Sequence, residues 1–88
     1  MTYMWCWNRV KDYEIWLKIF QSHVSARQKA GIHLEKIYKS VDDPADVYFL
    51  LRVEDRTRAE AFVARPENVA AGEEAGVISG EIIYLEEI

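Results

Sequence analysis

A histidine and an arginine four residues apart, His23 and Arg27, are the residues of this chain best suited to chemistry. On a helix that turns by about 100° per residue, both lie within about 20° of Trp16, and Phe20 lies about 40° from it. The opposite side of the same stretch carries Glu, Lys, Gln and Ser side chains. The spacing therefore predicts an apolar helix face from which one imidazole and one guanidinium point into the protein.

An arginine on an apolar face needs a partner, because taking a guanidinium out of water is costly. In a structural interpretation, Arg27 pairs with a buried carboxylate such as Glu81 or with backbone carbonyls at the end of the second strand, and His23 is a hydrogen-bonded core residue. In a functional interpretation, both side chains line a pocket walled by Trp16 and Phe20. His23 then transfers a proton near neutral pH. Arg27 holds a carboxylate, a phenolate or a developing enolate oxygen.

Further polar residues are candidates for substrate contacts. Asn8, at the end of the first strand, could orient a substrate oxygen, although Asn at a strand end more often bonds its own turn. Tyr38 and Tyr84 could each donate a phenol hydrogen bond into a pocket, with packing as the alternative for both. The sequence thus predicts His23 and Arg27 as catalytic residues and, as substrate-binding residues, Trp16, Phe20, Asn8, Tyr38 and Tyr84.

No spacing in the sequence indicates a metal or a cofactor. His33 is the only other histidine and falls on a different element, so a metal or haem role for His23 is the weakest alternative. The chain has no CxxC, no GxGxxG and no phosphate-binding P-loop. We therefore expect no bound cofactor and no metal.

Size and charge bound the remaining classes of function. A chain of 88 residues forms one domain, 1–88, which is marginal as a monomer because it buries only about 60–65% of its unfolded surface. The net charge of −4 and the scattered basic residues argue against nucleic-acid and anionic-membrane partners. A single cysteine, the lack of a signal-peptide pattern and the lack of a membrane-spanning apolar run predict a cytoplasmic protein.

The sequence pattern of the elements that position these residues occurs twice in the chain. RVKD at 9–12 and RVED at 52–55 each follow an apolar run and precede a stretch with helical spacing. We expect strands at 2–9, 32–41, 46–53 and 78–88, with a turn at 42–46. Helices are expected from 13 to about 30 and from about 58 to 75. Two strand–helix–strand units of this length predict an α+β, ferredoxin-like βαββαβ fold, a four-stranded antiparallel sheet with two helices on one face.

Helix boundaries carry their own signals. Asp12 can cap the first helix, and Thr57 with Glu60 forms a capping box for the second. Pro66 is expected to kink or split the second helix. Gly31 and Gly76 are expected to end the two helices in the left-handed conformation.

The sequence predicts that the face of the sheet not covered by helices is buried. Apart from the second strand, the strands do not alternate between apolar and polar residues, as a sheet face in water would require. Trp5 and Trp7 share one face of the first strand, and Cys6 lies on the other as a small apolar group. We expect this bare face to pack against a second copy of the chain, which would also relieve the marginal size of one protomer.

Three stretches carry a resemblance that covers nearly the whole chain: VKDYEIW-x3-F-x2-H-x3-R-x3-G (10–31), DP-x2-V (43–47) and the AGV–strand ending from 75 onward. In these the sequence resembles the dimeric α+β barrel proteins, which include antibiotic-biosynthesis monooxygenases and small polyketide cyclases. The resemblance implies a homodimer whose two sheets close into a barrel, with a ligand pocket between helices and sheet in each subunit. It says little about the reaction, because the fold hosts many chemistries.

The second helix departs from that resemblance. Its ENVAAGEEA stretch (67–75) places small residues where larger apolar ones are expected, so either the pocket is enlarged or the helix lies closer to the sheet and closes it.

Two hypotheses for the function stay open. The first is a cofactor-independent cyclase, isomerase or monooxygenase acting on a small aromatic or polyketide-like molecule, and the second is a non-catalytic ligand-binding or structural dimer. A cavity of about 300 Å³ or more that reaches His23 would favour the enzyme.

Overall fold

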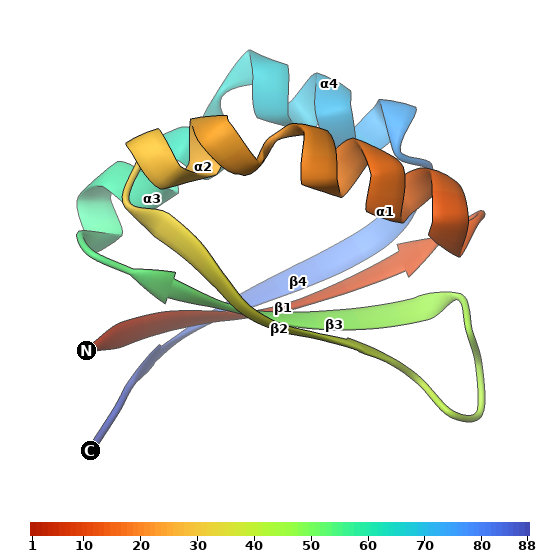
Figure 1. The fold of residues 1–88 in the computed structure, drawn as a ribbon, viewed down its shortest axis with the longest axis horizontal. Coiled ribbons are helices and arrows are strands. Elements are labelled where there is room, and N and C mark those ends of the chain that lie inside the picture. The colour runs from red at the N-terminus through yellow and green to blue at the C-terminus, as the bar shows by residue number, and fades with distance from the viewer.

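The chain forms a two-layer structure in which helices cover one face of a single sheet (Figure 1). The computed structural model describes all 88 residues. The strands are β1 (Thr2–Val10), β2 (Ile32–Lys39), β3 (Asp46–Val53) and β4 (Val77–Glu86), and the helices are α1 (Tyr13–Ser22), α2 (Val24–Lys29), α3 (Arg56–Ala64) and α4 (Pro66–Glu74). The strands pair antiparallel in the order β2-β3-β1-β4. The predicted α+β, ferredoxin-like fold is confirmed, with each expected helix present as a pair of shorter ones.

The aspartate that ends each repeated RVKD or RVED segment caps the helix that follows it. The Asp12 carboxylate accepts a hydrogen bond from the Ile15 N–H at 3.1 Å, and the Asp55 carboxylate accepts one from the Arg58 N–H at 3.0 Å. The prediction that Asp12 caps the first helix is confirmed. The capping box at Thr57 is wrong, because the helix already begins at Arg56 and its cap is Asp55.

The first helix is interrupted at His23, where a continuous helix from 13 to 30 was expected. His23 adopts φ −101° and ψ 13° and separates α1 from α2. No Gly or Pro marks this point. Instead the guanidinium of Arg27 donates a hydrogen bond to the Phe20 carbonyl in the last turn of α1 at 2.7 Å. A side-chain donor inserted into the backbone hydrogen-bond ladder is a recognised cause of helix breaks.

The second interruption follows from a proline. Arg65 takes the extended conformation, with φ −63° and ψ 139°, and Pro66 opens α4. A residue before proline avoids the helical region, so the predicted split at Pro66 is confirmed. Gly31 and Gly76 have φ of 76° and 77°, which confirms their predicted roles at the helix ends.

The two faces of the sheet differ in what covers them. Side chains that face the helices form the core, and they include Met4, Cys6, Val47, Phe49 and Leu51. The opposite face carries Trp5, Trp7, Tyr48, Leu50 and Ile83, none of them buried in the protomer.

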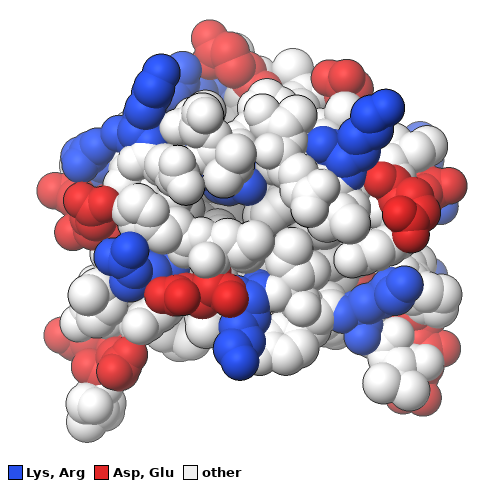
Figure 2. Space-filling view, in the orientation of Figure 1, with Lys and Arg blue, Asp and Glu red and all other residues white.

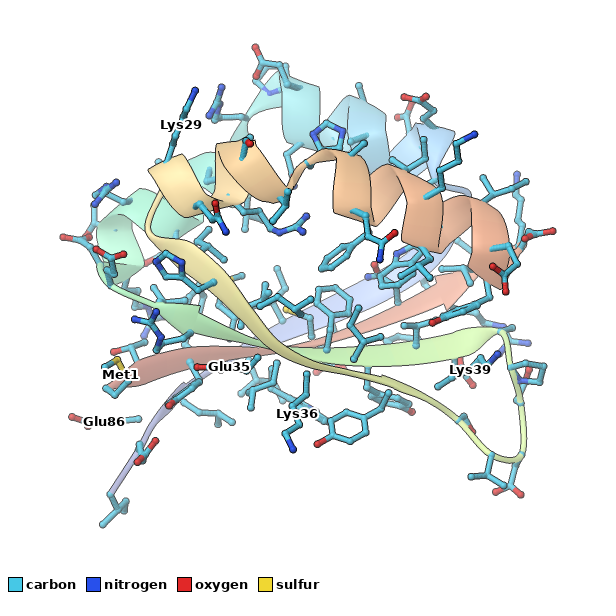
Figure 3. All side chains as sticks on the ribbon, in the orientation of Figure 1. Met1, Lys29, Glu35, Lys36, Lys39 and Glu86 are labelled. Atoms are coloured by element: carbon cyan, nitrogen blue, oxygen red, sulfur yellow. The ribbon has the colours of Figure 1, made fainter.

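That opposite face is built largely from aromatic rings. Trp5 stacks on Tyr48 with ring centroids 6.0 Å apart, and Tyr38 lies 6.1 Å from Trp5. Lys36 also projects from this side of the sheet (Figure 3). We call this side of the sheet, opposite the helices, the open sheet face.

None of the four helices combines the length and apolar composition needed to cross a bilayer.

Candidate functional site

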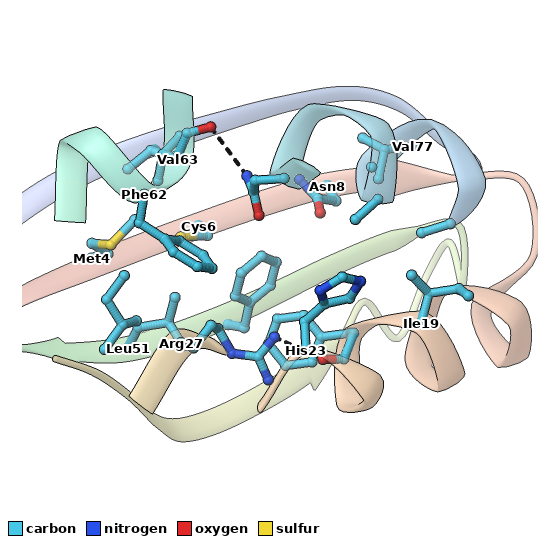
Figure 4. Close-up of a pocket in the computed structure, with 18 of the residues that line it drawn as sticks. Met4, Cys6, Asn8, Ile19, His23, Arg27, Leu51, Phe62, Val63 and Val77 are labelled. Atoms are coloured by element: carbon cyan, nitrogen blue, oxygen red, sulfur yellow. Dashed lines mark hydrogen bonds between the residues drawn. The ribbon is translucent and has the colours of Figure 1, made fainter. Parts of the chain in front are cut away.

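A cavity of about 170 Å³ lies between the helices and the sheet. Its floor comes from all four strands, one wall from α1 and α2, and the other from α3 and α4. Most of the lining side chains are apolar, and the polar ones are Asn8, His23, Arg27 and Asn68. His23 and Arg27 project into the cavity from the same side, and Val63 lies on the opposite side (Figure 4). We call this the helix–sheet cavity.

Arg27 is the only charged side chain among the buried residues, at 7% exposure. Its guanidinium donates to the Phe20 carbonyl at 2.7 Å and lies 3.8 Å from the centroid of the Phe20 ring. The carbonyl belongs to the C-terminal turn of α1, where the helix dipole favours a cation. One hydrogen bond and one ring contact hold the side chain in place and leave most of its N–H donors without a protein partner.

No carboxylate compensates the charge of Arg27. None of the ion pairs of the protein includes it. Glu81, the partner considered from the sequence, pairs in register with Trp7 and is exposed on the open sheet face, so that prediction is wrong. The carbonyl that Arg27 reaches is in α1 and not at the end of β2. Burial lowers the pKa of Arg27 to about 10, so the side chain is still a cation at neutral pH.

The nitrogens of Arg27 that have no hydrogen-bond partner are not sealed from solvent. No side-chain nitrogen or oxygen in the protein is both fully buried and without a hydrogen-bond partner. Arg27 also lines the cavity, so a ligand there lies beside a guanidinium that still has donors to offer. In the space-filling view, one small, partly covered patch of basic atoms is surrounded by uncharged atoms beneath the helices (Figure 2).

His23 stands at the edge of the same cavity. It is half-buried, lies at the junction of α1 and α2, and its imidazole makes no hydrogen bond within the protein. The core-histidine interpretation required a hydrogen-bonded ring, which this structure does not have. An imidazole that is free on both nitrogens and open to a cavity can accept or donate a proton there.

Trp16, Phe20 and Asn8 form one connected group in the cavity wall. The rings of Trp16 and Phe20 stack with centroids 4.8 Å apart. The Trp16 indole N–H donates to the Asn8 side-chain oxygen at 3.2 Å, and the Asn8 amide donates to the Trp7 carbonyl at 2.8 Å. A Cβ atom at Gly80 would lie 2.7 Å from the Asn8 amide nitrogen, so Gly80 leaves the space that this amide occupies.

The structure does not bring Tyr38 and Tyr84 to this cavity. Tyr38 lies on the open sheet face beside Trp5. Tyr84 packs against the core, and the guanidinium of Arg56 lies 4.4 Å from the centroid of its ring. Burial raises the pKa of Tyr84 above its ordinary value. Trp16, Phe20 and Asn8, by contrast, all line the cavity with His23 and Arg27.

The small residues of α4 leave the cavity open. Asn68, Ala71, Gly72 and Ala75 all line it, and a Cβ atom at Gly72 would meet nothing within 4 Å. The sequence carried the signal for this wall, because positions 68, 71, 72 and 75 have the spacing of one helix face. Asn68 is the polar residue that the sequence reading missed.

The cavity limits what can bind. Its volume is below the roughly 300 Å³ at which ordinary ligand pockets begin. It is close to the roughly 150 Å³ that holds one benzene molecule in an engineered protein cavity. A single substituted ring is therefore the scale of ligand that fits the protomer, and a haem is much larger. His, Cys, Asp and Glu side chains form no group of three that could hold a metal ion.

No family model matches the sequence, and no curated protein matches it. Among solved structures, the chain is similar to an antibiotic biosynthesis monooxygenase, with a TM-score of 0.72 and 15% identity over 100% of this chain and 99% of the other. It is also similar to a conserved protein from Methanosarcina mazei Go1 (TM-score 0.75, 13% identity, 99% and 92% covered). A third similar structure is an uncharacterized NIPSNAP domain protein from Burkholderia xenovorans (TM-score 0.69, 16% identity, 100% and 95% covered). At these identities the likeness shows the fold alone: the chain has the ferredoxin-like α+β fold found in antibiotic biosynthesis monooxygenase structures.

Proposed function

We propose that this protein is a homodimeric, cofactor-independent enzyme that binds a small anionic aromatic molecule in the helix–sheet cavity and transfers a proton to or from it. The observation that carries the proposal is the buried guanidinium of Arg27, which lines the cavity and has no carboxylate partner. A buried cation without a counter-charge is costly, and an anionic ligand would supply that charge.

The chemistry follows from the two polar groups on one wall. The N–H donors of Arg27 would hold a carboxylate, phenolate or enolate oxygen, and they act strongly in an apolar cavity because the local dielectric is low. The imidazole of His23 would remove a proton next to that oxygen and return it to another position. Loss of the proton leaves a carbanion whose charge is shared with that oxygen as an enolate, and return of the proton at another position completes an isomerisation. Attack of the same carbanion on a carbonyl carbon of the ligand would be a cyclisation, and its reaction with O2 would be an oxygenation.

Dimerisation through the open sheet face is part of the proposal. The unburied side chains of Trp5, Trp7, Tyr48, Leu50 and Ile83 support it, because an aromatic and aliphatic surface of this kind is usually covered in solution. Two such faces packed together would make the barrel that the sequence resemblance implies. The sequence resemblance to dimeric α+β barrel proteins supports the arrangement.

A non-catalytic ligand-binding dimer is the second candidate, and the cavity volume favours it. At about 170 Å³ the cavity admits a ring and leaves little room for a second reactant. In this case Arg27 binds the anion and His23 only completes the rim.

Deuterium exchange separates the two candidates. 2′-Hydroxyacetophenone is a single ring whose ketone oxygen becomes the enolate oxygen that Arg27 would hold, and exchange of its acidic methyl group in D2O is followed by proton NMR. The enzyme predicts exchange about 100-fold or more above buffer, lost in His23→Gln while ligand binding persists. Binding without exchange in the wild type would reject the enzyme and leave the binding protein. Failure of Arg27→Met to weaken binding would reject both.

A further inference from the structure

The polar groups of the helix–sheet cavity differ in how far the protein already satisfies them. The Asn8 oxygen accepts from Trp16, and one of its amide hydrogens is donated to the Trp7 carbonyl. Arg27 offers donors only. The remaining amide in the lining is that of Asn68, in the first turn of α4.

Asn68 is held in a defined orientation. Its amide nitrogen donates to the Val63 backbone carbonyl at 3.2 Å. A carbonyl can only accept, so the nitrogen of the amide must face Val63 and the oxygen must point away from it. The bond spans the split between α3 and α4, which Pro66 imposes, and this fixes the side chain without help from a ligand.

The oxygen of Asn68 is free to accept a hydrogen bond. No hydrogen bond in the protein uses it, and it is not sealed from solvent, because no buried side-chain oxygen lacks a partner. Asn68 also lines the cavity. Val63 lies across the cavity from Arg27 (Figure 4), so the amide that bonds it belongs to the wall opposite the guanidinium. The cavity thus has a charged donor on one wall and a neutral acceptor on the other, with apolar side chains between.

We infer that Asn68 determines the specificity of the site: its side-chain oxygen accepts a hydrogen bond from a hydroxyl or amino group on the ligand, remote from the anionic oxygen that Arg27 holds. This inference rests on the proposed function, and it narrows the ligand to a single-ring anion that also carries a hydrogen-bond donor. A ring without the donor would displace water from the Asn68 oxygen and leave that oxygen without a hydrogen bond, so such a ligand should bind more weakly.

Benzoate, the three hydroxybenzoates and their methyl ethers test the inference by calorimetric titration. The wild type is expected to bind the best hydroxybenzoate about 5- to 10-fold more tightly than benzoate, the effect of one neutral hydrogen bond. Its methyl ether, which cannot donate, should lose that advantage. In Asn68→Ala the hydroxybenzoate and benzoate should bind equally. The control is Val69→Ala, a change at a side chain 54% exposed on the same helix, which should keep the wild-type ratio.

The ratio reports on recognition and not on folding, because a general loss of structure weakens all the ligands together. Equal affinity for benzoate and every hydroxybenzoate in the wild type overturns the inference, and so does an unchanged ratio in Asn68→Ala. The wild-type comparison with the methyl ethers stands even when Asn68→Ala does not fold. If benzoate binding still depends on Arg27, the proposed function survives that failure. If no compound binds, both proposals fall.

Discussion

The guanidinium of Arg27 lies 3.8 Å from the centroid of the Phe20 ring and donates to the backbone carbonyl of the same residue at 2.7 Å. One residue of α1 therefore positions the buried cation twice, through its ring and through its carbonyl. The contact interrupts the helix at His23 and leaves the other nitrogens of Arg27, a residue that lines the cavity, without a protein partner. The helix break and the binding site have the same origin.

Two glycines of the second half should respond oppositely to alanine. Gly72 is helical and a Cβ atom there meets nothing within 4 Å, so Gly72→Ala should raise the free energy of unfolding by about 1 kcal/mol. Gly76 has φ 77°, a conformation that alanine avoids, so Gly76→Ala should lower it by about 1 kcal/mol. Urea unfolding of both variants checks this. A Gly72→Ala protein less stable than wild type would mean that the cavity wall is packed and not open.

The helix caps give a second stability test. Asp12→Ala and Asp55→Ala should each lower the free energy of unfolding by about 1 kcal/mol, because each removes a side-chain acceptor from a helix N-terminus. Thr57→Ala is the matched control and should change it by no more than a few tenths of a kcal/mol, since its hydroxyl makes no hydrogen bond. A loss at Thr57 equal to that at Asp55 would restore the capping box and contradict the observed helix start.

These caps illustrate how far the sequence leads. The RVKD and RVED repeats, the glycines at 31 and 76 and the proline at 66 are local signals. They predicted the order of strands and helices along the chain, the ends of both helical stretches and the split at Pro66. The cap at Asp55 was missed because Thr57 and Glu60 offered a competing motif that begins two residues later. When two capping motifs lie close together in the sequence, they predict that a helix begins there but do not tell which residue is its first.

The break at His23 had no local signal. It depends on Arg27 reaching the Phe20 carbonyl, a contact that only the folded chain makes. The same holds for the site. Trp16, Phe20, His23 and Arg27 share a helix face and were found from spacing, whereas Tyr38 and Tyr84 required knowledge of strand facing and packing. Asn68 was not predicted as a ligand contact, because its orientation depends on the hydrogen bond from its amide to the Val63 carbonyl, which only the folded chain makes.

Cys6 should make stability depend on pH. Burial raises the pKa of its thiol to about 12 from a reference value of 9.0, so the folded protein holds the proton more tightly than the unfolded chain. The contribution is therefore complete below pH 9 and is lost as the pH rises from about 9 toward about 12. Between about pH 8 and about pH 10.5 the wild type should lose about 2 kcal/mol relative to Cys6→Ala.

Urea unfolding of both proteins at the two pH values measures this difference. A gap between wild type and Cys6→Ala that stays constant over this range would show that the thiol is in contact with water.

The open sheet face should hold the dimer together. Trp5→Glu places a charge among Trp7, Tyr48 and Ile83, and burying that charge in an interface is costly. Analytical ultracentrifugation should give a dimer for the wild type and a monomer for this variant. Val41→Glu, at a side chain 98% exposed in the turn between β2 and β3, is the control and should stay dimeric. A monomeric wild type at millimolar concentration would remove the barrel from the proposal.

The central claim is that Arg27 binds an anion in the helix–sheet cavity. Titration of wild type and Arg27→Met with benzoate, followed by NMR, tests this claim most directly. Methionine keeps much of the side-chain volume and removes a buried charge, so the variant should stay folded, with stability changed by about 1 kcal/mol or less. We predict saturable shifts at residues lining the cavity in the wild type and affinity at least about 10-fold weaker in Arg27→Met. Equal binding by the two proteins, or no saturable binding to the wild type, would contradict the account.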